Sequence, residues 1–235
     1  MGLADRRYMR GGPAGSPVPA THAFLGLLVG FFILGLVAEA SGTGFLADLA
    51  LRRDHPRLWQ PLTYALLHAD FWHLLGNGLI LWWVGPLVEI ARGRAALWRI
   101  LALGTVAGAA AWLLTGIGST HLSAPLAGAS AAVLAAMVVG LDGREDEGVT
   151  LLLFFFLPVH VRVRWVLAAA WALALTGWIF SELPAAHAWS GWQPAWQSPI
   201  AHSAHLGGLL VGWIVARRLR RSDPEPAPRL RVVVV

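Results

Sequence analysis

The chain has 235 residues, of which 57% are hydrophobic and only 13% are charged, and its formal net charge is +5. A soluble domain has about 25% charged residues, whereas several stretches of this chain run for about 20 residues almost without charge, enough to cross a lipid bilayer. This composition excludes a soluble globular protein and predicts an integral membrane protein. The absence of cysteine excludes disulfides, thiol catalysis and cysteine-ligated metals.

Residues 1–21 are polar and rich in proline and glycine, which predicts a flexible N-terminal arm and no cleavable signal. Residues 22–216 form one membrane domain, and residues 217–235 form a basic, proline-rich tail. The membrane domain contains six apolar stretches, each a predicted span: 22–40, 70–91, 97–117, 122–141, 164–180 and 200–216. The fifth span follows an apolar segment that Pro158 interrupts. The expected fold is therefore an all-α bundle of six transmembrane helices.

The arginines predict the orientation of these spans. Six spans put both termini on one side, and all but three of the 18 basic residues, every one an arginine, would lie on that side. Because cytoplasmic loops are enriched in basic residues, both termini are predicted to be cytoplasmic. The exceptions are Arg52, Arg53 and Arg57, whose mixture with Trp59 and several leucines predicts a partly embedded first connection, residues 41–69. Because the arginines flank apolar segments, nucleic-acid binding is not expected.

The second span opens with HADFWHLLGN, residues 68–77. Asp70 stands where a helix N-cap belongs. His73 and Asn77 are four residues apart, so they share one helical face and can donate hydrogen bonds inward at the same depth, or bond to each other or to a neighbouring carbonyl as a packing contact. A metal held by His68 and His73 is disfavoured, because their spacing of five places them on different helical faces and the HExxH glutamate is missing.

The fourth stretch contains LAGASAAVLAAM, residues 126–137, in which Ser130 is the one polar side chain. Pro125 and Gly128 predict that the helix begins near Gly128, which leaves about 21 Å of helix against roughly 30 Å of hydrocarbon core. The preceding backbone would then be irregular within the membrane, buried in protein or lining a water-filled cavity. Ser130 would lie in the first turn, where free N–H groups stabilise an oxyanion, although a small hydroxyl can also serve packing alone.

The sixth span begins AHSAHLGGLLVGW and carries His202 and His205 near its start. Ionisable side chains within a membrane are functional candidates. Gly208 and Gly212 form a GxxxG pair that lets the small residues of the fourth span approach closely, so a histidine one turn earlier can reach the Ser130 hydroxyl. The fourth and sixth spans contain no aspartate or glutamate, which favours a Ser–His dyad over a triad.

From about residue 58 to 216 the chain resembles the rhomboid intramembrane serine proteases. The resemblance rests on four motifs in the family's order: HADFWHLLGN, GPLVEIARG, GASA and AHSAHLGGLLVG. It implies that Ser130 attacks the peptide bond and that His205 is its base, because His205 stands in the family's AHxxGxxxG setting with Gly208 and Gly212. His202 is then interpreted as a polar residue facing the mouth of the cavity.

The resemblance also assigns supporting groups. His73 and Asn77 would join the backbone N–H of Ser130 as oxyanion donors, while His68 would support the loop and Gly128 belongs to the serine motif. It implies no cofactor and no metal.

Two positions depart from the family's pattern. Gln60 follows Trp59 where the family has arginine, and Ala131 follows Ser130 where the family has glycine. If residue 131 needed a positive φ, alanine would be costly. In the first turn of a helix, alanine is the better helix former by about 1 kcal/mol, and this second interpretation is favoured.

The predicted function is that of a serine endopeptidase in a bacterial inner (plasma) membrane, which cleaves transmembrane segments of other proteins within the lipid bilayer. One alternative is a catalytically inactive rhomboid-like protein that binds membrane-protein clients. Another is a small transporter whose broken fourth span lines a substrate path, but this alternative predicts inverted repeats that the sequence does not display.

Overall fold

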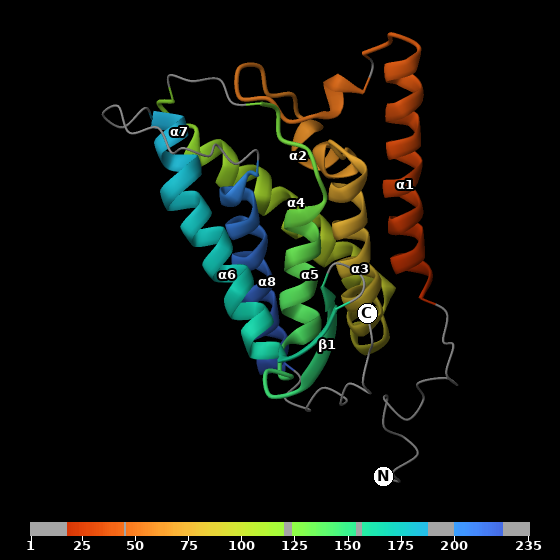
Figure 1. The fold of residues 1–235 in the computed structure, drawn as a ribbon, viewed down its shortest axis with the longest axis vertical. Coiled ribbons are helices and arrows are strands. Elements are labelled where there is room, and N and C mark those ends of the chain that lie inside the picture. The colour runs from red at the N-terminus through yellow and green to blue at the C-terminus, as the bar shows by residue number, and fades with distance from the viewer. Residues whose placement is uncertain (1–17, 45, 120–123, 154–156, 188–199, 223–235) are drawn as a thin grey trace.

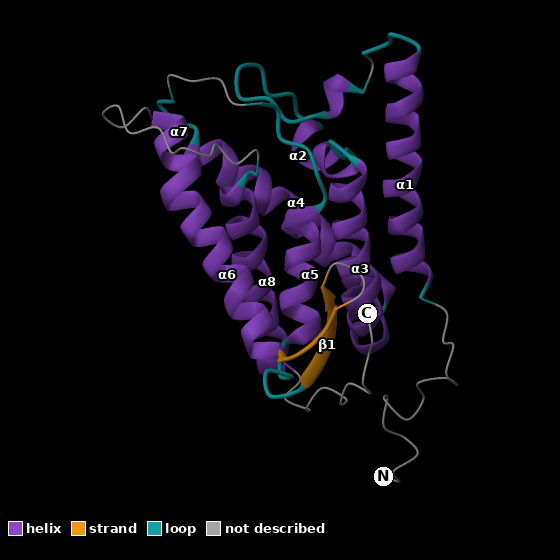
Figure 2. Ribbon diagram, in the orientation of Figure 1, coloured by secondary structure: helices purple, strands orange, loops and turns teal. Residues whose placement is uncertain are grey.

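The computed structural model of the chain describes residues 18–44, 46–119, 124–153, 157–187 and 200–222, and it is largely helical (Figures 1 and 2). Long helices stand side by side, and short helices and loops cover one end of the bundle. The elements are α1 Pro19–Ala40, η2 Ala47–Leu49, α2 Gln60–Thr63, η3 Tyr64–Leu66, α3 Phe71–Arg92, α4 Arg94–Thr115, α5 Ser130–Leu141, β1 Gly148–Leu153, β2 Leu157–Arg162, α6 Val163–Gly177, η4 Trp178–Glu182, α7 Leu183–His187 and α8 His202–Ser222.

Among the described residues, four helical segments are long and apolar enough to cross a membrane by length and composition: Pro19–Ala40, Phe71–Arg92, Arg94–Thr115 and Val163–His187. They correspond to the first, second, third and fifth predicted spans. The helix predicted to begin near Gly128 begins at Ser130 and is an apolar helix of 12 residues, α5. Gly128 itself precedes the helix because its φ of +120° is not helical.

Helix α1 begins at Pro19, three residues before the predicted start of the first span. Proline suits the first turn because it has no N–H group to satisfy. The carboxylate of Glu89 in α3 accepts hydrogen bonds from the backbone N–H groups of Ala20 and Thr21, both at 2.9 Å, and from the Thr21 hydroxyl at 2.8 Å. Glu89 therefore satisfies the first turn of α1 and ties this helix to α3.

The apolar segment around Pro158 forms an antiparallel β-hairpin, so the prediction of an all-α fold is wrong for this segment. Strands β1 and β2 pair from Gly148 opposite Arg162 to Leu153 opposite Leu157. The sequence HVRVR alternates polar and apolar side chains, which is the period of a strand. This period indicates a strand, and the hairpin lies at the end of the bundle, next to the start of α6.

The fifth predicted span continues beyond residue 180. Helix α6 passes into a π-helical turn, η4, and then into α7, which ends at His187. Two contacts join this region to the end of α4: the Trp178 indole N–H donates to the Thr115 hydroxyl at 3.1 Å, and His187 Nε2 lies 3.0 Å from the Thr115 carbonyl oxygen.

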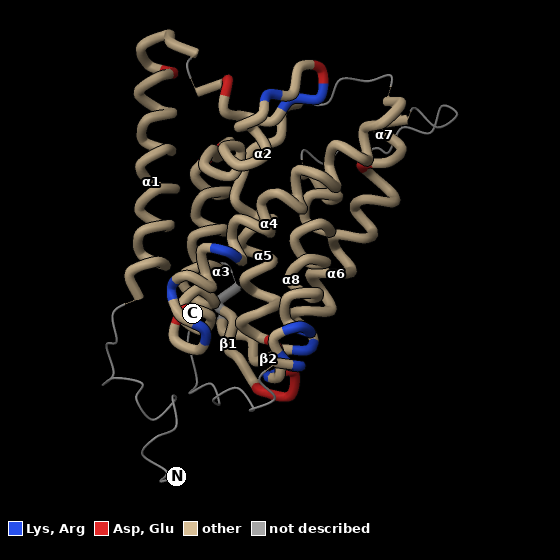
Figure 3. The backbone as a smooth tube through the Cα atoms, turned by 180° about the vertical axis from the view of Figure 1, so that it is seen from behind, with Lys and Arg blue, Asp and Glu red and all other residues tan. Residues whose placement is uncertain are grey.

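Helix α8 extends to Ser222, past the predicted end of the sixth span at residue 216. Arginine is a good helix former, and cations near a helix C-terminus are stabilised by the helix dipole. Residues 217–222 are therefore helical, and the remainder of the predicted tail, with residues 1–17 of the predicted arm, lies outside the described residues. Figure 3 shows the arginines of α8 and of the α3–α4 junction at the same end of the bundle, with those of the first connection at the opposite end.

Helix α5 packs against α8 through very small side chains. Gly208 and Gly212 of α8 face Ala131 and Ala135 of α5, in agreement with the GxxxG prediction. A Cβ atom at Gly208 would overlap the backbone of Ala131, so only glycine permits this approach. The close contact fixes the start of α8 beside the start of α5.

Candidate active site

The segment before Ser130 enters the bundle as non-helical backbone (Figure 1). Leu51 and Leu126 exchange two backbone hydrogen bonds, of 3.1 and 2.8 Å, and the Gly128 N–H donates to the Tyr64 carbonyl at 3.0 Å. The buried Tyr64 hydroxyl donates in turn to the Thr105 carbonyl of α4 at 2.8 Å. The first connection therefore supplies hydrogen-bond partners for irregular backbone that would otherwise be costly to bury.

Gly128 is required by its conformation and by its neighbour. Its φ of +120° is rarely adopted by residues with a side chain, and a Cβ atom there would lie 2.5 Å from His73 Cε1 and 2.7 Å from His73 Nε2. The absence of a side chain thus lets the His73 imidazole lie against the backbone two residues before Ser130.

Ser130 and His205 lie within hydrogen-bond distance. Ser130 is the first residue of α5, His205 lies in the first turn of α8, and His205 Nε2 is 2.8 Å from Ser130 Oγ. Both side chains are partly buried. With its proton on Nδ1, the imidazole can accept the hydroxyl proton, which is the geometry that a general base needs.

His202 occupies a different position. Its ring packs against Gly177 of α6, where a Cβ atom would overlap it, and it meets the His205 ring edge to face at a centroid distance of 6.1 Å. Among the described residues its buried Nδ1 has no hydrogen-bond partner. The contact with the Ser130 hydroxyl is made by His205.

The residues of the HADFWHLLGN motif form one cluster. The Asp70 carboxylate accepts from the His73 N–H at 2.9 Å, so the predicted N-cap is confirmed. The Asn77 amide donates to His68 Nε2 at 3.1 Å, so the possible His73–Asn77 packing contact is replaced by this pair. Burial, followed by the charge of His73, lowers the pKa of His68 to about 4, which keeps His68 neutral and able to accept from Asn77 at pH 7.

Contrary to the prediction, His68 and His73 are not separated onto different faces of one helix. His68 precedes α3 rather than lying on it, and the two rings are 5.0 Å apart. Within the described ranges, no group of three or more His, Asp or Glu side chains is arranged to hold a metal ion.

Gln60, the first departure from the family's pattern, anchors the first connection. Its fully buried side chain accepts from the N–H groups of Arg57, at 3.0 Å, and Arg52, at 3.4 Å, and donates to the Asp48 carbonyl at 3.2 Å. A glutamine amide offers both an acceptor and donors, so it can hold three backbone groups of one loop.

A second anchor links the first connection to the helix of His205, and the sequence analysis missed it. The Arg53 guanidinium lies 3.8 Å from the centroid of the Trp112 ring, donates to the Trp112 carbonyl at 2.7 Å and lies 3.8 Å from Glu182. Glu182 accepts from the Ser203 N–H at 2.6 Å and from its hydroxyl at 2.5 Å. Because Ser203 lies in the first turn of α8, Glu182 caps the helix that carries His205.

Ala131, the second departure, lies in the first turn of α5 and is buried. Its methyl group faces Gly108 of α4, where an added Cβ atom would lie only 2.5 Å from it. The alanine side chain therefore fits because the opposing residue of α4 has none.

A model of the Rhomboid domain matches residues 55–222, which contain Ser130, His205 and the HADFWHLLGN cluster. A comparison with curated proteins finds no match. The matched residues make up more than half of the chain and include three of the four long apolar segments found in its described part. The chain therefore belongs to the rhomboid family and is a membrane protein.

Proposed function

We propose that this rhomboid is an active intramembrane serine endopeptidase, which cleaves transmembrane segments of other membrane proteins with a Ser130–His205 dyad. The family includes proteases and inactive members, so membership alone does not decide the activity. The observation that carries the proposal is the 2.8 Å contact between His205 Nε2 and Ser130 Oγ at the start of α5.

The proposed reaction follows from this contact. His205 removes the proton as Ser130 Oγ attacks the peptide carbonyl, and it then returns the proton to the leaving amine. The negative oxygen of the intermediate is stabilised by the Ser130 N–H in the first turn of α5, together with His73 and Asn77. His205 then takes a proton from water as the water attacks the acyl-enzyme. It returns this proton to Ser130 Oγ when the carboxylic acid product leaves.

The proposed topology places six helices across the membrane, with α5 and α8 added to the four long apolar segments. Both termini would face the cytoplasm of a bacterium, because the arginines of the α3–α4 junction and of α8 gather at one end (Figure 3). At 1.5 Å per residue α5 is only about 18 Å long, which would place Ser130 below the opposite membrane surface. Water would reach it from the non-cytoplasmic face.

The substrates are expected to be transmembrane helices with residues that weaken the helix. A helical peptide bond in lipid is shielded and hydrogen-bonded, so the chain must unwind locally before Ser130 can reach a carbonyl carbon.

The direct test is to reconstitute the full chain with a panel of single-span membrane proteins. We expect cleavage, and labelling of Ser130 by a fluorophosphonate, in the wild type. Both should be lost in Ser130→Ala and His205→Ala, whereas His202→Ala should keep most of the activity. Client binding without cleavage or labelling would instead indicate an inactive family member, and a dead His202→Ala beside a live His205→Ala would reverse the assignment of the base.

The oxyanion donors are tested in the same assay. We expect His73→Ala and Asn77→Ala each to slow cleavage by about 10²–10³, roughly 2.7–4 kcal/mol of barrier, without abolishing it. Wild-type rates in both variants would show that the pair serves packing alone.

A further inference from the structure

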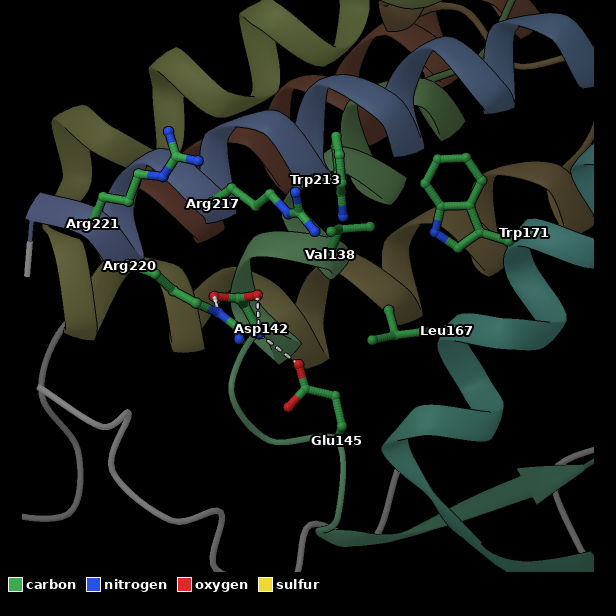
Figure 4. Close-up of a pocket in the computed structure, with 9 residues that line it drawn as sticks. All are labelled: Val138, Asp142, Glu145, Leu167, Trp171, Trp213, Arg217, Arg220 and Arg221. Carbon is green, nitrogen blue, oxygen red and sulfur yellow. Dashed lines mark hydrogen bonds and ion pairs between the residues drawn. The ribbon is translucent and has the colours of Figure 1, made fainter. Parts of the chain in front are cut away.

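A pocket lies at the end of the bundle away from Ser130. It is a pocket of about 430 Å³ between the end of α5, the first half of α6 and the end of α8 (Figure 4). The residues that line it are Val138, Asp142, Glu145, Leu167, Trp171, Trp213, Arg217, Arg220 and Arg221. Arginines from the end of α8 make one part of the pocket basic. Apolar and aromatic side chains of α5, α6 and α8 line the rest.

Ion pairs inside the pocket hold Arg220 but leave other cations available. Arg220 makes two hydrogen bonds to Asp142, of 2.6 and 2.5 Å, and one of 2.7 Å to Glu145. Over the described part of the chain, Arg217 and Arg221 form no ion pair with a carboxylate. Three arginines against two carboxylates leave a net positive charge, which favours an anion.

The aromatic side chains give the pocket an amphipathic character. The Arg217 guanidinium lies 4.1 Å from the centroid of the Trp213 ring, which fixes its position while leaving its N–H edge available. Trp171 and Leu167 of α6 form the opposite wall (Figure 4). Tryptophan is enriched where a bilayer meets water, and basic pockets between transmembrane helices suit lipid headgroups.

We propose that this pocket binds an anionic phospholipid, with the phosphate at Arg217 and an acyl chain along Leu167 and Trp171. Charge complementarity and the apolar wall favour a lipid over a free phosphate, because a free phosphate has no apolar group to pack against this wall. Since the pocket joins the end of α5 to the end of α8, the bound lipid contacts both helices that carry the candidate dyad. The lipid site itself does not depend on catalysis.

The test is native mass spectrometry of the full chain with phosphatidylglycerol and with phosphatidylcholine of the same acyl chains. We expect preferential binding of phosphatidylglycerol, and Arg217→Gln should lower it about fivefold, which is typical of one cation at a lipid surface. Arg218→Gln is the matched control, because Arg218 is the next residue of α8 but does not line the pocket. Its effect should stay within about twofold.

A variant with the opposite expected sign keeps the test independent of misfolding. Asp142→Asn releases Arg220 from its bidentate pair and should raise phosphatidylglycerol binding. Equal losses in Arg217→Gln and Arg218→Gln would reduce the effect to general surface charge and overturn the site. Equal binding of the two lipids, or displacement of phosphatidylglycerol by excess inorganic phosphate, would also overturn it.

Discussion

Different forces hold the inner helices (α3, α4, α5 and α8) and the outer helices (α1 and α6) of this protein. In the most apolar windows of α3 and α4, 44% of residues are buried, against 17% in α1 and 11% in the segment of α6 to α7. Helices α4, α5 and α8 meet through glycine and alanine, backbone against backbone. The buried carboxylate of Glu89 also attaches α1 to α3, and the carboxylate of Glu182, in the turn that follows α6, attaches this segment to the start of α8.

This difference shows how a bundle can be rigid where chemistry is proposed and more loosely attached elsewhere. Lipid offers no hydrophobic force between helices, so close packing of small residues must hold the inner helices. The outer helices gain less from packing, and a carboxylate that satisfies the free N–H groups of a helix start supplies a local, polar attachment.

Breaking the inner contact should have the largest effect. Gly208→Ala places a methyl group into the backbone of Ala131 and is expected to cost about 3 kcal/mol of folding free energy, as overpacking does. The measurement is the free energy of unfolding in detergent. Gly30→Ala in α1 is the control, because nothing lies within 4 Å of the added Cβ, and it should stabilise by up to about 1 kcal/mol. Equal effects of the two changes would contradict the close contact between α5 and α8.

Breaking the attachment of α1 should have a smaller and local effect. Glu89→Gln loses the charge that accepts three hydrogen bonds, and we expect a cost of about 2 kcal/mol, the scale of a hydrogen bond to a charged group. Hydrogen exchange should accelerate in the first turn of α1 and not in α5. Glu39→Gln, at the exposed far end of α1, should change neither the stability nor the hydrogen exchange of the first turn of α1. A uniform acceleration throughout the bundle would mean that α1 is not a separable element.

The attachment between η4 and α8 is expected to act on the reaction rate through the position of His205. Glu182→Gln weakens the cap on Ser203, and we expect kcat to fall about tenfold, about 1.4 kcal/mol of barrier, with little change in KM. Ser203→Ala removes only the hydroxyl contact and should have less effect. If fluorophosphonate labelling of Ser130 stays at the wild-type rate while stability falls, Glu182 is a structural residue alone.

The smallest effect is expected at the centre of the inner contact. Ala131→Gly should keep activity within about tenfold and destabilise α5 by about 1 kcal/mol, because glycine is the poorer helix former at this position. Cleavage and fluorophosphonate labelling at neutral pH check the rate. A gain of a hundredfold or more would mean that the alanine, despite its fit against Gly108, marks a lapsed protease.

The elements that could be predicted from the sequence are those with a strong local signal. Uninterrupted apolar stretches identify the long helices, and the GxxxG spacing predicts the contact of Gly208 with Ala131. Asp70, directly before α3, predicts the N-cap of that helix. The hairpin was not predicted because only the hydrophobicity of this segment was considered, and not the alternation of polar and apolar side chains in HVRVR. Glu182 was missed because its partners, Arg53 and Ser203, are distant in sequence, and only the π-helical turn brings it to α8. Its one local signal was a lone acidic residue just after an apolar stretch.

The pairing of Leu51 with Leu126 has a consequence for biosynthesis. The segment that sets Ser130 in place is bound by residues made much earlier, whereas His205 is made 75 residues after Ser130. Because contacts between distant residues form late, we expect Leu51 to remain unpaired until Leu126 has been synthesised. Ser130 and His205 are expected to meet only when α8 has joined the bundle. A nascent chain in the membrane would then have no assembled Ser130–His205 contact, so the proposed activity would begin only after α8 has been made.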